Sequence, residues 1–327
     1  MSNHPTVNFK PGFGLANPHV QTIMSSVGRR QWVPQAIQQF LSKGEDQIIE
    51  VCGVRLKVTL HHLPGAPLIS LIPGWLGSSA SAYVVSMGQQ LAEAGYSVAR
   101  INLRDHGDTA ALNAGLFNSA LIDEVVSLIS HLNETYGGQQ NGLVGFSLGG
   151  NFALRVAKRL PELMCLAVCP AINPADTMYQ IDSNPVYQKY FVRKWRKTWA
   201  AKQSAFPAQY DFSRAMQLNT VSALTDYFVR YHSLYATTDE YFAAYDLSGT
   251  YLNQVQAHIL ASFDDPVIPS AQWQQLPDTI KVSMTNHGGH GAYLSNWRLE
   301  SWADTYALQL FSALQHESGS IASTAAQ

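Results

Sequence analysis

The stretch Leu143–Leu154, LVGFSLGGNFAL, joins an apolar run to a helix-like run through a serine that stands between two glycines. Gly145, Ser147 and Gly149 form the pattern G-x-S-x-G at this join. A sharp turn from a buried strand into a helix forces the serine into a strained backbone conformation, and glycines avoid side-chain collisions there. In this context the pattern predicts a nucleophile elbow, which projects the Ser147 hydroxyl out of a sheet.

Strand-like and helix-like segments alternate on both sides of this elbow. Eight apolar or β-branched runs have the length of strands; two lie within 47–63, and the others in 67–75, 97–104, 142–147, 164–172, 257–263 and 279–285. Alternation of this kind predicts an α/β fold with a mostly parallel eight-stranded sheet and helices on both faces. The two leading strands, which flank Gly53, are expected to form an antiparallel edge.

The alternation divides the chain into four parts. We expect residues 1–45 to be an irregular arm packed on the core, and residues 46–172 together with 256–316 to form that core. After the sixth strand, residues 173–255 are rich in aromatic side chains and helical in period, which predicts a helical cap over the carboxyl edge of the sheet, where ligands bind in such folds. The polar segment 317–327 is expected to be a flexible tail.

A serine hydroxyl needs a base, and the elbow fold orders its triad as serine, acid and histidine along the chain. The stretch FDDPVIP places Asp264 and Asp265 after a strand, and the position of Pro269 favours Asp265 as the acid over Asp264. The stretch NHGGHG follows the next strand, and its glycine-flanked His290 is favoured as the base over His287. A His287–His290 metal pair is the alternative, but no third ligand of suitable spacing is nearby.

Attack on a carbonyl creates an oxyanion that needs positioned donors. The backbone N–H of Leu148 directly follows the nucleophile and is one candidate. The N–H of Trp75, in the PGWLGSS loop after the 67–73 strand, is the second candidate. The alternative interpretation is that Pro73-Gly74 forms a simple turn.

Several of these motifs resemble the α/β-hydrolase superfamily, and within it the YheT-like branch (AB hydrolase family 4), over about residues 10–315. The motifs that carry the resemblance are ANPHVQT (16–22), PGWLGSSASAYV, GFSLGGN, DDPVIP and GGHGAY. The resemblance implies a carboxylic-ester hydrolase that acts on acyl esters, often lipid-like, without a metal or organic cofactor. It gives the triad roles to Ser147, Asp265 and His290.

The chain departs from that family pattern at two loops. The family's oxyanion loop usually starts His-Gly, whereas Pro73-Gly74 stands here. The segment 102–120 resembles the Arg-x-His-Gly loop of other α/β hydrolases, and we expect its Asp105 and His106 to brace loops rather than to react.

The cap should determine which ester is bound. Tyr179, Tyr187 and Phe191 are candidates to line a substrate pocket, or they are core between cap helices. The basic, aromatic segment 192–199 suits either peripheral membrane contact or a solvated basic face.

Bulk properties exclude several function classes. The formal net charge of −2 gives no field that would attract nucleic acid. No signal peptide and no apolar run long enough to span a bilayer is recognised. The small, odd number of cysteines, Cys52, Cys165 and Cys169, fits a reducing compartment, so a cytoplasmic location is expected. Cys165 and Cys169 are interpreted as small buried hydrophobes.

Three functions fit these observations. The first is a serine esterase that works through an acyl-enzyme. The second is an acyltransferase that uses the same triad and passes the acyl group to an alcohol or thiol. The third is a non-catalytic ligand-binding protein on this fold, which the presence of all three triad candidates disfavours.

Overall fold

A computed structural model of the protein describes residues 6–26, 34–273 and 276–324. Its centre is one eight-stranded sheet with the strand order β1-β2-β4-β3-β5-β6-β7-β8. The strands are β1 (Glu45–Val51), β2 (Val54–His61), β3 (Leu68–Ile72), β4 (Ser97–Ile101), β5 (Gly142–Phe146), β6 (Met164–Val168), β7 (Ala257–Ser262) and β8 (Ile280–Thr285).

The predicted sheet topology is confirmed. β2 pairs antiparallel with both β1 and β4, and every pairing from β4 through β3 to β8 is parallel. All five residues of each of β3, β4 and β5 are buried. Continuous burial is typical of parallel strands that are covered by helices on both faces, which explains why their sequences read as unbroken apolar runs.

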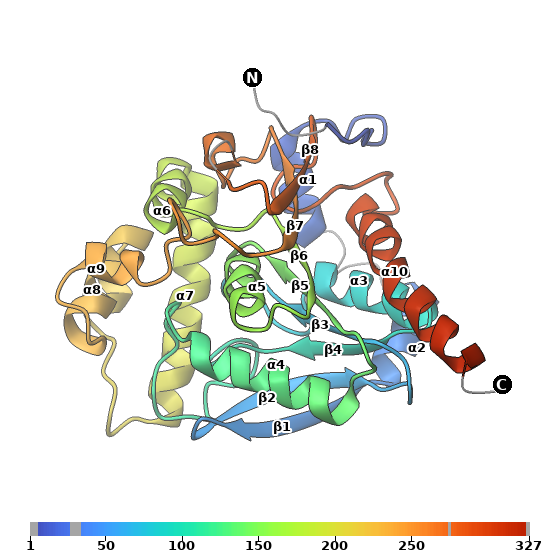
Figure 1. The fold of residues 1–327 in the computed structure, drawn as a ribbon. Helices are drawn as coiled ribbons and strands as arrows, with labels where there is room; N and C mark the ends of the chain where they lie inside the picture. Colours follow the sequence, from blue (N-terminus) through green and yellow to red (C-terminus); the bar gives the residue numbers. More distant parts are fainter. Residues whose placement is uncertain (1–5, 27–33, 274–275, 325–327) are drawn as a thin grey trace.

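Helices cover the two faces of the sheet in pairs (Figure 1). α3 and α10 share one buried cluster with the strands, and α4 and α5 contribute to a second, larger one. The bounds of these four helices are α3 (Ala82–Glu93), α4 (Ile122–Tyr136), α5 (Leu148–Arg159) and α10 (Trp302–Thr324). The backbone of α10 is helical to Thr324, which lies within the segment 317–327 that was predicted to be a flexible tail. Residues 325–327 lie outside the described residues.

The chain between β6 and β7 is helical and stands beside the sheet as a cap (Figure 1). Its elements are α6 (Pro174–Ser183), α7 (Pro185–Ala205), the 3-10 turn η2 (Ala215–Gln217), α8 (Val221–His232) and α9 (Thr238–Ala243). Each of the four α-helices of the cap begins with a side-chain N-cap that accepts a hydrogen bond from a backbone N–H of the first turn. The N-cap residues are Asn173, Asn184, Thr220 and Thr237. A second 3-10 turn, η3 (Ser270–Trp273), follows β7.

The predicted irregular arm contains two helices, α1 (Pro18–Ser26) and α2 (Gln35–Ser42). The expectation of irregular structure over 1–45 was therefore wrong for these segments. Residues 1–5 and 27–33 lie outside the described residues. α1 lacks a sustained apolar period, and contacts with distant loops rather than local propensity stabilise it, as the site shows below.

Candidate active site

Ser147 occupies the turn between β5 and α5 with φ 54° and ψ −117°. A left-handed φ is strained for a serine and is typical of functional sites. A Cβ at Gly145 would lie 2.0 Å from the carbonyl oxygen of Gly149, and a Cβ at Gly149 would lie 2.4 Å from the carbonyl oxygen of Ile72. No larger residue fits at either position, so the glycines are required by the turn that presents Ser147.

The structure brings Ser147, His290 and Asp265 together at the carboxyl edge of the sheet. His290 Nε2 lies 2.9 Å from Ser147 Oγ, and His290 Nδ1 lies 2.9 Å from Asp265 Oδ2. The side chain of Asp265 is fully buried and its Oδ1 also accepts hydrogen bonds from the N–H groups of Val267 and Ile268. These bonds fix the carboxylate, so the imidazole can accept the hydroxyl proton while Asp265 holds its other nitrogen.

The two alternative residues take other roles. Asp264 Oδ1 accepts a hydrogen bond from the N–H of Gly289, which ties the histidine loop to the turn after β7. His287 is 44% exposed, and its Nδ1 lies 3.5 Å from Asp264 Oδ2. The geometry therefore pairs His290 with Asp265, whereas Asp264 holds the loop that carries His290 through the N–H of Gly289.

The arm supplies residues to this site that no sequence pattern had assigned to it. The N–H of His290 donates a hydrogen bond of 2.9 Å to Thr22 Oγ1, and Thr22 Oγ1 donates in turn to the carbonyl of Pro18. Gln21, with no exposed surface, donates to the carbonyls of Leu15 and Leu294 and accepts from the N–H of Leu294. The ANPHVQT motif is the signal that marks this helix, and its polar residues hold the histidine loop in place.

The loop after β3 is held by partners from two other elements. Tyr83 accepts a hydrogen bond from the N–H of Gly74, and His106 Nε2 accepts one of 3.0 Å from the N–H of Leu76. His106 Nδ1 lies 2.8 Å from the carbonyl of Arg104, so the ring is a neutral tautomer that donates there. Burial lowers the pKa of His106 to about 4, which keeps the ring neutral. The prediction that His106 braces a loop is confirmed, and His106 does so in place of a His-Gly start.

Asp105 braces the same region through a buried ion pair with the cap. Lys202 Nζ, on α7, lies 2.6 Å from Asp105 Oδ1, and the two side chains are 0% and 3% exposed. Asp105 Oδ2 accepts a hydrogen bond from the N–H of Phe117. Burial raises the pKa of Asp105 and lowers that of Lys202, whereas their mutual attraction opposes both shifts. The ion pair fastens the cap to the loop that carries His106.

The two predicted oxyanion donors, the N–H groups of Leu148 and Trp75, belong to residues that line the same cavity as Ser147. Leu148 begins α5, so its N–H has no acceptor within the helix. Among the hydrogen bonds of the described residues, none is donated by the N–H of Leu148 or of Trp75. Both residues line the cavity that Ser147 opens into. Their role as oxyanion donors stays a prediction.

Cys169 also belongs to the site, although its sequence suggested only a small buried hydrophobe. Its Sγ and ligand atoms of Asp265 and His290 all lie within 4.8 Å of one another, a spacing that could hold a metal ion. Burial and the neighbouring Asp265 carboxylate raise the pKa of the Cys169 thiol well above its ordinary value. Cys169 Sγ lies 3.6 Å from the Tyr293 hydroxyl, and Asp265 and His290 are hydrogen-bonded to each other, so hydrogen bonding accounts for the cluster.

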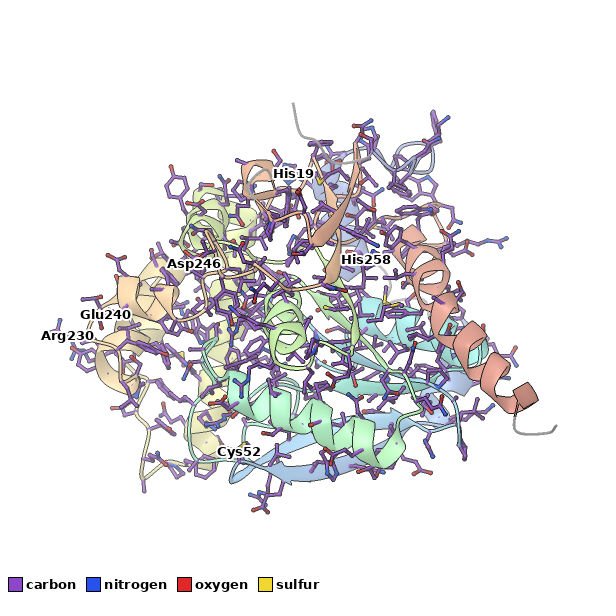
Figure 2. The ribbon with its side chains drawn as sticks, viewed as in Figure 1. His19, Cys52, Arg230, Glu240, Asp246 and His258 are labelled. Atoms are coloured by element: carbon purple, nitrogen blue, oxygen red, sulfur yellow. The ribbon has the colours of Figure 1, made fainter. Side chains whose placement is uncertain are left out.

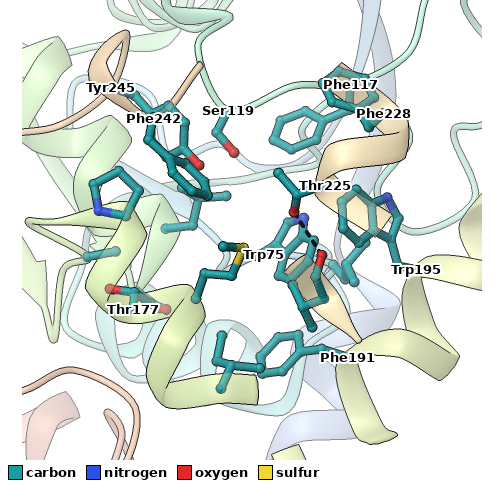
Figure 3. Close-up of a pocket in the computed structure, with 18 of the residues that line it drawn as sticks. Trp75, Phe117, Ser119, Thr177, Phe191, Trp195, Thr225, Phe228, Phe242 and Tyr245 are labelled. Carbon is teal, nitrogen blue, oxygen red and sulfur yellow. Dashed lines mark hydrogen bonds between the residues drawn. The ribbon is translucent and has the colours of Figure 1, made fainter. Parts of the chain in front are cut away.

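Two cavities meet at Ser147, and the predicted pocket residues divide between them. Phe191 lines both cavities and Tyr187 lines the second. Tyr179 lines neither and is 71% exposed, so its assignment to the pocket was wrong. The helical repeat explains this, because α6 turns Pro174, Thr177, Met178 and Ile181 toward the first cavity (Figure 3) and Tyr179 away from it.

The segment 192–199 lies within α7 and turns its aromatic side chains inward. Trp195 contacts Trp75, and Trp199 is 3% exposed. Arg193 and Lys197 are exposed, which fits a solvated basic face as well as peripheral membrane contact. In the described part of the chain, no helix is both long enough and apolar enough to cross a membrane.

Comparison with known proteins agrees with this geometry. In sequence, the chain is 23% identical to "Putative esterase YheT" of Escherichia coli (strain K12), over 92% of this chain and 94% of that protein. It is also 23% identical to human phospholipase ABHD3 over 75% of this chain, but it spans only 62% of that relative's length. The resemblance to the YheT-like branch is thus confirmed, and a hydrolase is the class of enzyme that these relatives support.

In structure, the chain is similar to the esterase Pf2001 of Pyrococcus furiosus, with a TM-score of 0.57 and 14% identity over 96% of this chain and 97% of that one. At this identity the likeness concerns the fold alone. The model of the family described as "alpha/beta hydrolase fold" matches residues 67–296, which is well over half of the 327 residues. The chain therefore belongs to the alpha/beta hydrolase fold family.

Proposed function

We propose that the protein is a serine hydrolase that cleaves carboxylic esters through an acyl-enzyme intermediate. The observation that carries this proposal is the continuous hydrogen-bonded chain from Ser147 Oγ through His290 to Asp265, with contacts of 2.9 Å on both sides of the imidazole. These distances lie within the range that proton transfer requires. The strained elbow and the fixed carboxylate add the preorganisation expected of a nucleophile and its orienting acid.

In the proposed first half-reaction, Ser147 Oγ attacks the ester carbonyl carbon while His290 Nε2 takes the hydroxyl proton. The carbonyl oxygen becomes an oxyanion, and the N–H groups of Leu148 and Trp75 donate hydrogen bonds to it. Asp265 accepts a hydrogen bond from His290 Nδ1–H, stays ionised and stabilises the imidazolium. The tetrahedral intermediate collapses when His290 protonates the departing alcohol oxygen, which leaves Ser147 acylated.

In the second half-reaction, water replaces the alcohol. His290 Nε2 takes a proton from the water, whose oxygen attacks the acyl carbon. The second oxyanion occupies the same two amides, and collapse returns the proton to Ser147 Oγ as the carboxylic acid leaves. The products are therefore one alcohol and one acid for each ester, and the enzyme returns to its starting state.

Acyl esters with an apolar acid part are the substrate class that the site suits best. Aromatic and aliphatic side chains dominate the first cavity, and the relatives include proteins named as esterase and phospholipase. We also propose a cytoplasmic location, because all three cysteines are free.

A fluorophosphonate probe, which reacts with activated serines, tests the nucleophile directly. Wild-type protein should be labelled on Ser147 and should hydrolyse p-nitrophenyl esters. Ser147→Ala should lose the label and lower kcat by at least about four orders of magnitude. Ser183→Ala is the matched control, because Ser183 is an exposed serine on α6 whose Oγ bonds only the carbonyl of Gln180. Unlabelled but folded wild-type protein would refute the proposal.

A further inference from the structure

The two cavities at Ser147 are separate compartments with a shared wall. Four residues line both of them, Trp75, Ser147, Phe191 and Val267. The rings of Trp75 and Phe191 stack with centroids 5.3 Å apart and an interplanar angle of 14°. Both cavities are partly open to solvent.

The position of His290 distinguishes the two cavities. His290 and Gly291 line the second cavity and do not line the first. In the proposed reaction, His290 must protonate the leaving oxygen, so that oxygen has to lie on the imidazole side of the reacting carbon. The oxyanion points at the backbone amides. The remaining substituent, the acyl chain, is then directed away from His290, into the first cavity.

The first cavity has the surface expected for an acyl chain. Its walls are largely aromatic and aliphatic, with Phe117, Trp195, Phe228 and Phe242 among them (Figure 3). Polar side chains in its wall already have partners in the fold. Thr177 and Thr225 donate to backbone carbonyls one helical turn earlier, and Asp105 is paired with Lys202. A hydrocarbon chain can therefore enter without leaving these groups unsatisfied.

The second cavity is also largely apolar, but it adds hydroxyl groups and one cation to that surface. Hydroxyl-bearing side chains from the arm, from α3 and from α7 line it, and Lys194 is its one cationic side chain among the described residues. Lys194 lies 5.1 Å from the ring centroid of Tyr190, and it forms no ion pair with any described residue. Burial raises the pKa of Tyr187, which lines the same cavity, to about 12. The Tyr187 hydroxyl lies 2.8 Å from Nδ1 of His19, and His19 lies on α1, at the top of the view in Figure 2. An uncompensated ammonium beside hydroxyl groups favours a ligand with a hydrogen-bond acceptor or negative charge.

We infer that the acyl part of the substrate occupies the first cavity and the alcohol part occupies the second, beside Lys194. The substrate class is therefore an ester between an apolar acid and a polar alcohol that carries an acceptor or anionic group. This inference rests on the proposed serine hydrolase function. It adds an assignment of each cavity to one part of the ester.

Variants that change one cavity at a time test the assignment. Thr225→Phe narrows the first cavity and should lower the octanoate-to-acetate ratio of kcat/KM for p-nitrophenyl esters by about tenfold or more. Trp195→Ala widens the same cavity and should move the preference toward longer acids. Trp195→Ala removes atoms and therefore does not overpack the core. It still tests the assignment if Thr225→Phe fails to fold.

The alcohol side is tested at constant acyl chain. Octanoyloxyacetate and octanoyloxyacetamide differ only in a carboxylate against an amide on the alcohol part. Wild-type protein should prefer the carboxylate by roughly fivefold to tenfold in kcat/KM, mainly through KM, and Lys194→Met should remove that preference. Ala82→Phe, which narrows the second cavity, should disfavour both of these esters relative to methyl octanoate and leave the acyl-length preference unchanged.

Tyr179→Ala is the control for both series, because Tyr179 lies on α6 outside both cavities. The assignment is overturned if Thr225→Phe or Trp195→Ala changes the alcohol preference instead of the acyl preference, or if Ala82→Phe changes the acyl preference. It is also overturned if Ser147 is labelled and esters are cleaved, yet all variants keep wild-type selectivity. Failure of wild-type protein both to be labelled and to cleave any ester would instead refute the proposed function, and the inference with it.

Discussion

The backbone N–H of His290 donates a hydrogen bond to Thr22 Oγ1, which lies 268 positions earlier in the chain. Gly289 approaches the arm so closely that a Cβ there would lie 2.7 Å from the carbonyl oxygen of Pro18. α1 therefore packs directly against the loop that carries His290, and this contact helps to fix the imidazole beside Ser147. The N-terminal helix is part of the active-site architecture.

Thr22 is thus expected to act as a positioning residue. Thr22→Val keeps the shape of the side chain and removes the acceptor, so His290 should lose its anchor. We expect kcat to fall by about tenfold with little change in KM, because the bond orients the base rather than the substrate. Steady-state kinetics with p-nitrophenyl butanoate measure both constants.

The conservative variant Thr22→Ser restores the hydroxyl and should recover most of the lost kcat. A merely structural role for Thr22 would instead lower the unfolding temperature of Thr22→Val without this selective loss of kcat. Equal kcat values in wild type, Thr22→Val and Thr22→Ser would show that the bond does not position His290.

Gly145 is expected to tolerate no side chain. A Cβ at this position would meet the Gly149 carbonyl at 2.0 Å and the Ala153 Cβ at 2.7 Å, and neither atom belongs to a flexible group. Gly145→Ala should therefore lower the free energy of unfolding by about 3 kcal/mol or more. Chemical denaturation followed by circular dichroism measures this change.

Gly53→Ala is the comparison for that variant. Nothing lies within 4 Å of a Cβ at Gly53, and only its φ of +71° opposes a side chain. The expected cost is about 1–2 kcal/mol. If Gly145→Ala cost no more than Gly53→Ala, the elbow would not be as tightly packed as the structure indicates.

His106 is expected to make stability depend on pH. Burial lowers its pKa from the ordinary value of 6.5 to about 4, so between these values the unfolded chain binds a proton that the folded protein does not. Stability contributed by the neutral ring is complete above pH 6.5 and is lost as pH falls toward 4. The slope is about 1.4 kcal/mol per pH unit, or about 3 kcal/mol in total.

His106→Gln removes the titrating group and leaves an amide oxygen that can accept from the N–H of Leu76. Urea unfolding of wild type and His106→Gln at pH 7 and pH 5 isolates the contribution of His106, because the other histidines are common to both proteins. Wild type should lose more stability than the variant over this interval, and identical losses would contradict the neutral, buried ring.

The Lys202–Asp105 pair is expected to be strongly coupled. Lys202→Met leaves the Asp105 carboxylate buried without its cation and should cost about 3–5 kcal/mol. Adding Asp105→Asn should recover part of this loss, since Asn tolerates the φ of 59° found at this position. A double-mutant cycle by denaturant unfolding measures the coupling, and additive losses would show that the two side chains act independently.

Local patterns predicted the parts of the site that short-range sterics control. Gly145 and Gly149 flank Ser147 because the turn leaves no room for side chains, and that requirement is visible in five residues of sequence. Asp265 and His290 follow strands whose apolar runs are unambiguous, so their arrival at one sheet edge follows from parallel pairing alone. The division of the chain into arm, core, cap and tail stays a prediction, although the cap helices occur where it places them.

The features that local sequence patterns did not predict depend on contacts between residues far apart in the chain. α1 has few apolar residues, and its stability depends on buried bonds between Gln21 and residues near position 294. Tyr179 was assigned to the pocket by residue type, whereas its exposure depends on the rotational phase of α6, which no local signal fixes. Cys169 enters the site because it directly follows β6, at the same sheet edge as Ser147, although its residue type alone suggests only a core position.

In the proposed reaction, the backbone N–H of Trp75 donates to the reacting carbonyl oxygen, while the Trp75 ring stacks on Phe191 of the cap helix α7. In this proposal, Trp75 thereby connects the oxyanion site to the first cavity, which holds the acyl chain. A poorly fitting chain that tilts α7 would also displace the amide that receives the negative charge. Esters whose acyl chain fits the first cavity poorly should consequently have a low kcat even at saturating concentration. Selectivity for the acyl chain should then appear in kcat as well as in the strength of binding.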